Sequence, residues 1–508
     1  MEKCIMLGKK VYLDDLINVA RYDYKVDFSK EYCNRVNESR NLVEKWVDEN
    51  EVIYGVTTGF GALCNKIISK EDTQKLQENI ILSHSTSVGE PFTRQEARAT
   101  IFMILQNIGQ GYSGVRLAVL EILKDMLNYD IVPYIPREGS VGYLCPEAHL
   151  ALVLIGKGKA YFKGELMSSK DALKKAGFTP IKLASKEGLA LVSGTTSVTA
   201  LGALALYDMI KSAKCADIIA ACSLEVSRGI ITAFDERVMK VRPHIHQDIT
   251  AFNIRKILAD SEVIENCKNE RLQDALSFRC VPQLHGAAKK TLTDAKEVIE
   301  TEMNSCCDNP IIYNDGENSR AISACNADSS YVGLEMDSAS IAATMIAKMS
   351  ERRNNRLIDS NLSSNPAFLI KNVGLNSGLM IPQYTQAGLL GDMRILSTPS
   401  VIDNTPTCMN QEDYVAMGYN ASKKAISVSE KLEYILAIEL LSAFQSSAFL
   451  DKKYKLSTPT NYIYEKLKEH IPVMEEDFYL YPHIQYLKNL IHSGDLIAWV
   501  EEKIGKLK

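Results

Sequence analysis

The sequence has little of what marks several large classes of protein. It has no excess of basic residues, because 63 Asp and Glu outnumber 58 Lys and Arg and give a net charge of −5. Nucleic-acid-binding proteins carry a strongly basic face, and many membrane-surface proteins carry a polybasic patch, so we expect neither partner. The polar residues 1–16 contain no apolar core of the kind found in signal peptides.

Disulfide and zinc frameworks are also missing. None of the twelve cysteines forms a Cys-x-x-Cys pair, although Cys306 and Cys307 are adjacent. This pattern predicts reduced thiols in a cytoplasmic protein. His244 and His246 with Asp248 could ligate a metal, but no further His or Cys cluster accompanies them. We therefore expect no metal.

Long apolar runs are scarce as well. The most apolar stretch, Gly188–Ile210, is interrupted by the polar segment 193–196. A membrane span needs about 20 mostly apolar residues, so this stretch predicts a buried helix. Met336–Arg353 and Lys423–Leu450 place small and apolar residues at three- and four-residue spacing without internal Pro or Gly. This periodicity predicts long helices of an all-α bundle.

Gly and Pro gather in connecting segments, where rigid scaffolds often hold their catalytic groups. These segments are 55–61, 132–146, 304–318 and 397–411. We expect short strands near the first of them and near Lys163–Lys182. We predict three domains: a loop-rich helical N-terminal part (1–185), a central long-helix bundle (186–450) and a helical C-terminal cap (451–508).

Several segments, spread from residue 52 to about residue 420, resemble the aromatic amino-acid ammonia-lyase and aminomutase family. Each match is weak alone, but their order along the chain makes a chance likeness untenable. The resemblance implies the all-α histidine ammonia-lyase-like fold and a homotetramer with active sites shared between subunits. The matching segments are 52–61 (VIYGVTTGFG), 76–91, 112–116, 187–195, 273–283, 304–310, 350–353 and 410–413.

One departure from the family concerns its electrophilic methylidene-imidazolone cofactor. The family builds this group from an Ala-Ser-Gly triplet after a lead-in that matches 139–142, but here Gly142 is followed directly by Tyr143. Without the triplet the group cannot form by the family route, so we expect no cofactor. Two neighbours of the cofactor also differ, because Ser193 replaces an Asn and Leu276 replaces a Tyr.

The missing electrophile suggests a substrate that does not need it. A trimethylammonium nitrogen has no lone pair to add to an electrophile, and it leaves as neutral trimethylamine. The chain is therefore closest in type to an ergothionase-like member of the family. The function expected on this basis is elimination of trimethylamine from the betaine ergothioneine to give thiourocanate.

The resemblance also assigns roles to residues of the site. Tyr54 would be the general base, which at an ordinary pKa of about 10 needs help to ionise near neutral pH. Arg279 would hold the substrate carboxylate, for which its fork geometry is suited. His84 and Glu412 would bind the imidazole ring.

Further residues are expected to bind substrate in the same site. Asn326 matches an active-site Asn of the family, and Asp328, which replaces a His, could hold a quaternary ammonium. Arg394 could polarise the thione sulfur. Ser193 and Tyr143 would line the place of the absent cofactor, with their roles open.

Two other functions remain possible at this point. The protein could be a histidine ammonia-lyase or aminomutase whose triplet is missing from the sequence as written. It could also be a catalytically inactive binding homologue. Retention of Tyr54, His84, Arg279 and Glu412 favours an enzyme, because a dead site has no reason to keep the whole set.

Overall fold

The fold was analysed in a computed structural model of the full chain. The structure describes residues 3–59, 61–63, 68–69 and 72–508, so Phe60 of the predicted tyrosine loop lies outside it. The chain divides into two compact units, each assembled from separate stretches of sequence. Unit 1 comprises the chain up to Leu204 together with Ala295–Asp337 and Pro399–Lys423, and unit 2 comprises Ala205–Asp294, Ser338–Thr398 and Lys424–Lys508.

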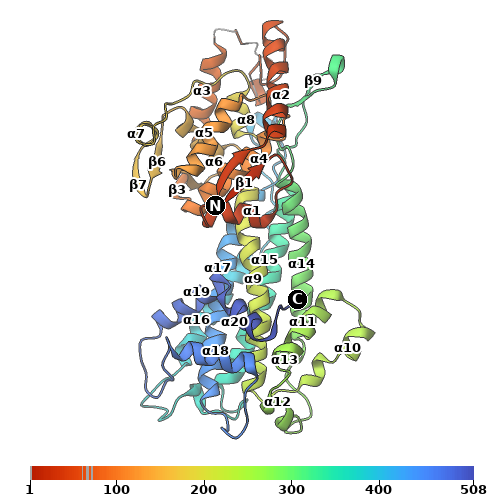
Figure 1. The fold of residues 1–508 in the computed structure, drawn as a ribbon, viewed down its shortest axis with the longest axis vertical. Coiled ribbons are helices and arrows are strands. Elements are labelled where there is room, and N and C mark those ends of the chain that lie inside the picture. Colours follow the sequence, from red (N-terminus) through yellow and green to blue (C-terminus); the bar gives the residue numbers. More distant parts are fainter. Residues whose placement is uncertain (1–2, 60, 64–67, 70–71) are drawn as a thin grey trace. The chain divides into compact units, whose positions relative to one another are not determined.

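Unit 1 packs short helices around the first turns of three long ones, α9, α15 and α17 (Figure 1). Its helices begin at residues that favour helix starts: Ser29 accepts a hydrogen bond from the Tyr32 amide at the start of α2, and Thr93 with Glu96 forms a capping box for α4. The helices of unit 1 are α1 (Leu13–Arg21), α2 (Lys30–Asp48), α3 (Thr73–His84), α4 (Arg94–Ile108), α5 (Leu117–Asn128), α6 (Cys145–Leu154), α7 (Ser169–Lys175) and α8 (Glu187–Val192).

The strands of the described chain are short and all lie in unit 1. They pair as β1 with β2 in parallel, and as β3–β5, β4–β6–β7 and β8–β9 in antiparallel fashion. β6 and β7 lie at the predicted place next to Lys163. The strands are β1 (Cys4–Leu7), β2 (Lys25–Phe28), β3 (Val88–Pro91), β4 (Ile131–Pro133), β5 (Pro136–Glu138), β6 (Lys159–Phe162), β7 (Glu165–Ser168), β8 (Ile311–Tyr313) and β9 (Arg320–Ile322).

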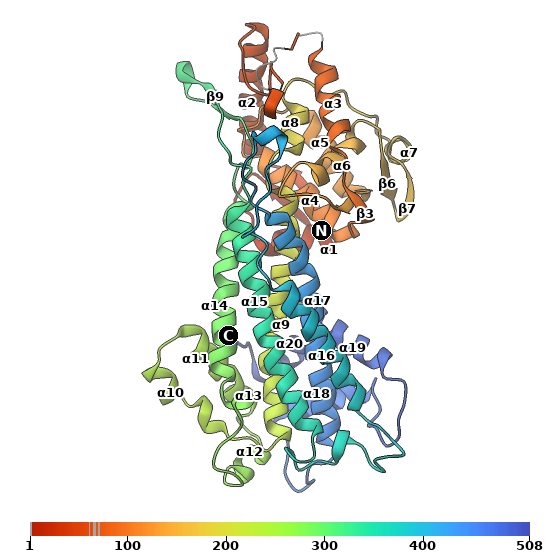
Figure 2. The same ribbon diagram turned by 180° about the vertical axis from the view of Figure 1, so that it is seen from behind.

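Unit 2 is a bundle in which long helices lie side by side in both views (Figures 1 and 2). The helices that lie in unit 2 or extend into it are α9 (Thr196–Val226), α10 (Glu236–Val241), α11 (Ile245–Ile257), α12 (Glu262–Cys267), α13 (Leu276–Arg279), α14 (Val281–Glu302), α15 (Ser330–Ile358), α16 (Met380–Leu396), α17 (Gly418–Ser447), α18 (Thr458–Lys468), α19 (Tyr481–Ser493) and α20 (Asp495–Ile504). Short 3-10 turns are Gly61–Leu63, Ile231–Phe234, Gly316–Asn318, Ala367–Leu369 and Cys408–Asn410.

The prediction of an all-α fold with long core helices is confirmed. The predicted helix 336–353 lies within α15, and most of 423–450 lies within α17. The stretch Glu187–Val226 is long and apolar enough to cross a membrane, but its most apolar window is wholly buried inside the fold. It consists of α8 and α9, which meet at the polar segment 193–195. Burial on all sides explains its composition without a lipid environment.

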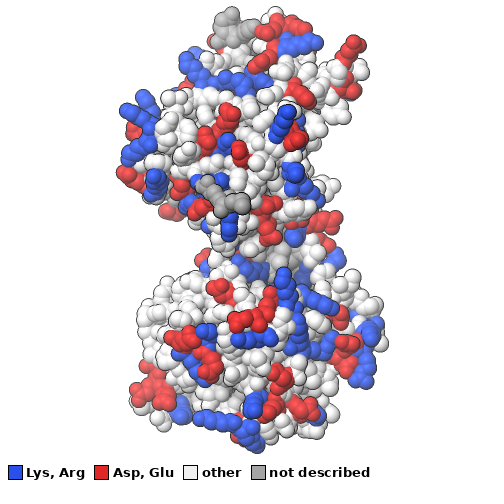
Figure 3. Space-filling view, viewed as in Figure 1, with Lys and Arg blue, Asp and Glu red and all other residues white. Residues whose placement is uncertain are grey.

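Charged side chains of both signs alternate over the face drawn in Figure 3. This pattern agrees with the near balance of 58 basic and 63 acidic residues. Eleven cysteines, those of the described ranges, are free thiols.

Candidate active site

Helix α8 is the platform on which the site segments of unit 1 meet. The tyrosine loop lies on it so closely that a Cβ on Gly55 would collide with the Leu189 side chain. Helix α3 approaches it from another side: a Cβ on Gly188 would lie 2.6 Å from the Gln77 carbonyl oxygen. The Leu144 amide donates to the Val192 carbonyl oxygen (3.2 Å). The segments around Tyr54, His84 and Tyr143 therefore share one support.

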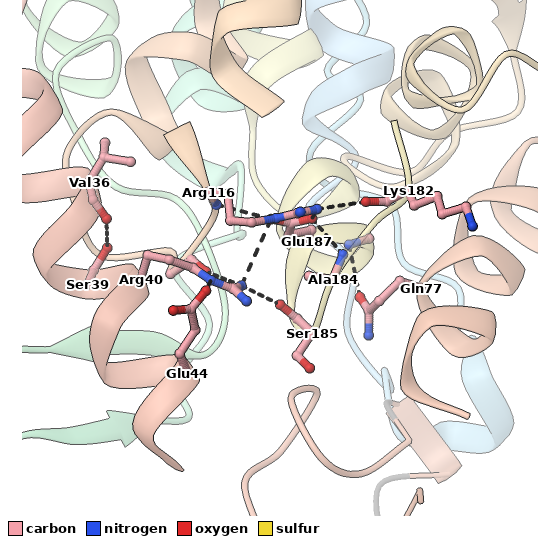
Figure 4. A network of polar contacts seen from close by, with 12 residues as sticks. Val36, Ser39, Arg40, Glu44, Gln77, Arg116, Lys182, Ala184, Ser185 and Glu187 are labelled. Atoms are coloured by element: carbon pink, nitrogen blue, oxygen red, sulfur yellow. Dashed lines mark hydrogen bonds and ion pairs between the residues drawn. The ribbon is translucent and has the colours of Figure 1, made fainter. Parts of the chain in front are cut away.

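A buried polar network holds α8 in place (Figure 4). The fully buried carboxylate of Glu187 accepts two hydrogen bonds from the Arg116 guanidinium, at 2.7 and 2.6 Å. The Arg116 and Ala184 amides donate to the same carboxylate (3.1 and 2.6 Å). Such bidentate, charge-assisted hydrogen bonds are strong and directional. Gln77 Oε1 accepts from the Gly188 amide (2.9 Å), which joins α3 to this network.

Tyr54 is half-buried, and its hydroxyl oxygen accepts a hydrogen bond from the Gly61 amide (3.1 Å). An N–H donor at this oxygen favours the phenolate over the phenol and thus helps the residue act as a base. A hydrophobic cluster, formed by Val43, Trp46, Ile53, Val56 and Ile312, anchors the start of the loop. Next to Gly61, the Ala62 amide donates to Cys408 Sγ (3.4 Å), so the tyrosine loop contacts the segment that leads to Glu412.

His84 and Glu412 lie within electrostatic reach of each other. His84 ends α3, and its Nδ1 lies 3.0 Å from Ser83 Oγ. Burial lowers the pKa of His84, and the Glu412 carboxylate acts against that shift. The imidazole is therefore mostly neutral near pH 7 and can both donate and accept. Glu412 Oε2 accepts from Thr407 Oγ1 (3.0 Å).

Tyr143 stands where the family builds its cofactor, within electrostatic reach of the Glu412 carboxylate. Burial raises the pKa of Tyr143, and so do Glu412, Cys325 and Asp328. These surroundings favour the neutral phenol form of Tyr143. The backbone is strained here: Leu144 has φ 80° and ψ −65°, and the Cys145 amide donates to the Tyr143 carbonyl oxygen (3.2 Å). This is the rare γ-turn with positive φ.

Asn326 and Asp328 lie on the segment that precedes α15. The Asn326 side chain donates to the Cys306 carbonyl oxygen (3.2 Å), and Asp328 Oδ1 accepts from the Ser330 amide at the start of α15 (2.8 Å). A Cβ on Gly142 would lie 2.8 Å from the hydroxyl oxygen of Ser329. The segment therefore contacts the Tyr143 loop directly.

Ser193 ends α8 and is buried. Its hydroxyl oxygen accepts from the Asn309 amide (3.2 Å). A fully buried ion pair between Lys186 and Asp308 (2.7 Å) ties the same loop to the start of α8. Ser193 thus positions the loop that contains Asn309. This structural role does not depend on any contact of Ser193 with a substrate.

Arg279 and Arg394 are the predicted site residues that belong to unit 2. Arg279 Nε donates to the Asp274 carbonyl oxygen (3.1 Å), and Asp274 also lines a cavity of about 410 Å³ in unit 2. Arg394 is exposed on α16. Tyr54, His84, Ser193, Asn326, Asp328 and Glu412 thus belong to unit 1, and the two arginines belong to unit 2.

The sequence predicts no metal site at His244 and His246. His244 precedes α11, and His246 Nε2 lies 3.1 Å from Thr293 Oγ1. Among the described residues, one His-and-carboxylate cluster has metal-ligand spacing, formed by Asp208, Glu433 and His492. Lys211 and Lys488 lie 3.6 and 3.2 Å from its two carboxylates and already balance their charge.

The residues present do not fit the family's cofactor. Cyclisation needs an Ala-Ser-Gly triplet, and the chain instead has Tyr143 in a γ-turn between Gly142 and the start of α6.

Sequence reasoning missed the residues that hold the site together. Gln77, Thr407 and Cys408 position α8, Glu412 and the tyrosine loop through the contacts described above. Their residue types carry no signal of their own. Cys325, whose pKa is raised by burial, by Asp328 and by Glu412, could have been noticed only for its place next to Asn326.

The whole chain resembles proteins of known name and structure. The family model described as aromatic amino acid lyase matches residues 11–469. The chain is 43% identical to histidine ammonia-lyase 1 of Fusobacterium nucleatum subsp. nucleatum, over 99% of this chain and 98% of that protein. The crystal structure of histidine ammonia-lyase from Trypanosoma cruzi has a TM-score of 0.92 and 33% identity, covering 98% of this chain and 95% of that one. Ergothionase from Treponema denticola, solved with desmethyl-ergothioneine sulfonic acid, has a TM-score of 0.90 and 27% identity, covering 97% and 100%.

These comparisons overturn the expectation that the substrate is ergothioneine and the product trimethylamine. Full-length identity is much higher to proteins named histidine ammonia-lyase than to the ergothionase, 43% against 27%. The expectation was wrong because it inferred the substrate from one property of the leaving group, its departure as a neutral molecule. A protonated primary amine is also a cation that departs as a neutral molecule, so a missing electrophile does not require methylation of the nitrogen.

Proposed function

The chain belongs to the aromatic amino acid lyase family and is a carbon–nitrogen lyase, and we propose that it converts histidine to urocanate and ammonia. The observation that carries this proposal is the neighbourhood of His84 and Glu412 in unit 1. The name of the relatives with about 40% identity, histidine ammonia-lyase, supports the same substrate.

His84 and Glu412 suit an imidazole ring better than an apolar one. A neutral imidazole offers one N–H donor and one nitrogen acceptor. A carboxylate, here Glu412, accepts from the N–H of the substrate ring, and the neutral His84 complements the other nitrogen. A phenyl ring would leave both groups desolvated without partners, which costs about 1–3 kcal/mol for each group.

Tyr54 is the base in this proposal. It removes the proton from the carbon next to the imidazole ring, and the electron pair forms the new double bond as the amine leaves. The Gly61 amide at its hydroxyl oxygen (3.1 Å) supports the ionised form. Its place on the anchored tyrosine loop holds it in one position, which proton transfer requires.

Arg279 is proposed to bind the substrate carboxylate from a second copy of the chain in a homotetramer. The support is its position in unit 2 together with an uncovered apolar face on α16. Ile381, Tyr384 and Ile395 are all more than half exposed, and their spacing of three and eleven residues puts them on one side of the helix. Exposed apolar patches of this kind mark interfaces.

Shared sites can be tested by complementation. The Tyr54→Phe and Arg279→Ala proteins should each be inactive. When they are dissociated and reassembled together, activity should return, because some sites then combine an intact Tyr54 from one copy with an intact Arg279 from another. Sedimentation velocity of Ile395→Glu should show dissociation, with Lys452→Glu as the control for added charge. A fully active monomer would disprove the shared site.

The proposed reaction is tested by incubating the purified protein with L-histidine and following urocanate by absorbance, with L-phenylalanine as the competing substrate. Glu412→Gln should raise KM for histidine about tenfold, the effect of one charge-assisted hydrogen bond. The exposed Glu90→Gln should leave KM unchanged. If histidine binds but is never converted, the protein is a binding homologue and the proposed activity is wrong.

We also propose a cytoplasmic location, which the free thiols of the described cysteines support.

A further inference from the structure

The turn Cys408–Asn410 of unit 1 holds an unfavourable backbone conformation. Its three residues have φ of 52°, 56° and 63°, and none of them is glycine. The left-handed conformation is costly for residues other than glycine and asparagine, so Cys408 and Met409 carry the strain. Met409 is 89% exposed, and apolar burial therefore does not stabilise this conformation. Strain of this kind persists where surrounding contacts impose it, and it is common at functional sites.

Hydrogen bonds on both sides of the turn impose its conformation. Thr407 and Glu412 form an antiparallel bridge, in which the Thr407 amide donates to the Glu412 carbonyl oxygen (2.8 Å). Thr407 Oγ1 also donates to Glu412 Oε2 (3.0 Å). Farther from the turn, the Asn404 side chain accepts from the Val415 amide (2.9 Å) and donates to the Asp413 carbonyl oxygen (3.0 Å). These contacts close a hairpin that holds the Glu412 carboxylate and the strained turn together.

The strained turn contacts the tyrosine loop through Cys408. Cys408 Sγ accepts from the Ala62 amide (3.4 Å), and a Cβ on Gly61 would lie 2.8 Å from the same sulfur. The adjoining Gly61 amide donates to the Tyr54 hydroxyl oxygen (3.1 Å). A continuous series of contacts therefore leads from Glu412, through the turn, to the hydroxyl of Tyr54, and all of these residues belong to unit 1.

On the basis of the proposed function, we propose that the strained turn positions the base Tyr54 from the segment that binds the substrate ring. Cys408 and Met409 are its positioning residues. Their left-handed conformation presents the Cys408 sulfur to the Gly61–Ala62 backbone, and this backbone orients the Tyr54 hydroxyl. A displacement of about 1 Å is enough to impair a reaction that needs aligned groups. The turn thus keeps the ring-binding carboxylate and the base at one spacing, which suits a substrate whose reacting carbon is attached to its ring.

Met409→Gly separates this positioning role from stability. Glycine adopts the left-handed conformation without strain, so the variant should be as stable as the wild type, or more stable, in urea denaturation. The turn is then free to leave that conformation, and kcat for histidine should fall about tenfold with KM little changed. Lys163→Gly is the matched control, because Lys163 is also exposed and left-handed (φ 49°) but lies in the turn between β6 and β7. It should keep full activity.

Two substitutions at Cys408 test the contact itself. Cys408→Ala removes the acceptor and should lower kcat about as far as Met409→Gly does. Cys408→Ser keeps an acceptor at this place and should retain most of the turnover. Hydrogen exchange followed by mass spectrometry gives a readout that needs no substrate: the amides of Gly61 and Ala62 should exchange faster in Cys408→Ala and Met409→Gly than in the wild type or in Lys163→Gly.

The outcomes separate this inference from the proposed function. Faster exchange of these amides in a protein that never converts histidine supports the positioning turn and contradicts the proposed substrate. Unchanged exchange in Cys408→Ala and Met409→Gly, or unchanged kcat in an active protein, overturns the inference and leaves the proposed reaction in place. A rise in KM without a fall in kcat also overturns it, because the turn would then serve only the ring-binding Glu412.

Discussion

Two fully buried carboxylates, one in each unit, have opposite electrostatic surroundings. In unit 2, Asp217 forms an ion pair with Lys289 and a 2.9 Å hydrogen bond with His285. Burial alone would raise the pKa of Asp217, but Lys289 and His285 hold it below its ordinary value of 3.8. In unit 1, Glu147 accepts from the Ser197 amide (2.9 Å), and burial raises its pKa above the ordinary 4.5.

The difference shows two ways in which this fold holds a buried acid, with a partner cation or with neutral donors alone. Unit 2 has a second buried acid held by a cation, in the Arg353–Glu439 pair of α15 and α17 (2.9 Å at Nη2). In unit 1, Glu412 accepts from the Thr407 hydroxyl and Asp328 accepts from the Ser330 amide. A partner cation keeps a buried acid ionised, whereas burial without one favours its protonated form.

Tyr54→Phe should have the largest effect and should act on catalysis alone. Turnover of histidine is expected to fall about 10³-fold, because a positioned base contributes about 10²–10⁴. The free energy of unfolding should change by about 1 kcal/mol or less, the value of one hydrogen bond. Steady-state kinetics and urea denaturation measure the two quantities, with the exposed Tyr22→Phe as the control. Retained turnover would remove Tyr54 from the mechanism.

Arg353→Met should instead act on stability, because it removes a buried ion pair between two long helices. It leaves Glu439 buried without its cation, which costs about 3–5 kcal/mol of unfolding free energy. Replacing both partners, as Arg353→Met with Glu439→Leu, should recover most of that loss because no uncompensated charge remains. Urea denaturation monitored by circular dichroism decides between these values. A single variant as stable as the wild type would show that the paired charge is not structural.

Glu147→Gln should reveal the unpaired acid through the pH dependence of stability. Because the pKa of Glu147 is raised in the fold, its contribution is full below pH 4.5 and is lost as pH rises through the folded pKa. The substituted amide cannot ionise and lacks this loss, so relative to the wild type the variant should gain about 1 kcal/mol between pH 4.5 and pH 8. Asp217→Asn has the opposite sign, since its lowered pKa contributes stability above pH 3.8. Equal slopes of stability against pH for both variants, measured by urea denaturation, would contradict the contrast between the two acids.

Lys290→Gln should have the smallest effect. Its ion pair with Asp294 lies on an exposed face of α14, with about half of each side chain accessible. Such pairs contribute about 0–1 kcal/mol and are screened by salt. A change in unfolding free energy above about 1 kcal/mol would mean that exposed pairs support the bundle as well. The denaturation midpoints of the variant and the wild type at low and high salt measure this change in unfolding free energy.

Much of the fold could be predicted because its signals are local. Three- and four-residue spacing within 336–353 and 423–450 indicated helices that the structure has in α15 and α17. The motif order indicated the family. The contacts of Gln77 with Gly188 and of Cys408 with Ala62 join residues 111 and 346 positions apart, and no local pattern encodes such pairings.

The sequence by itself determined the helix periodicity, the family and the absence of the cyclising triplet, because each is a property of residue order. Only the tertiary structure decided what surrounds the place of that triplet. The packing of Gly142 against Ser329, and the electrostatic proximity of Tyr143 to Glu412, bring together residues of different loops. Their charges interact through space, and electrostatic energy depends on distances that the order of residues does not contain.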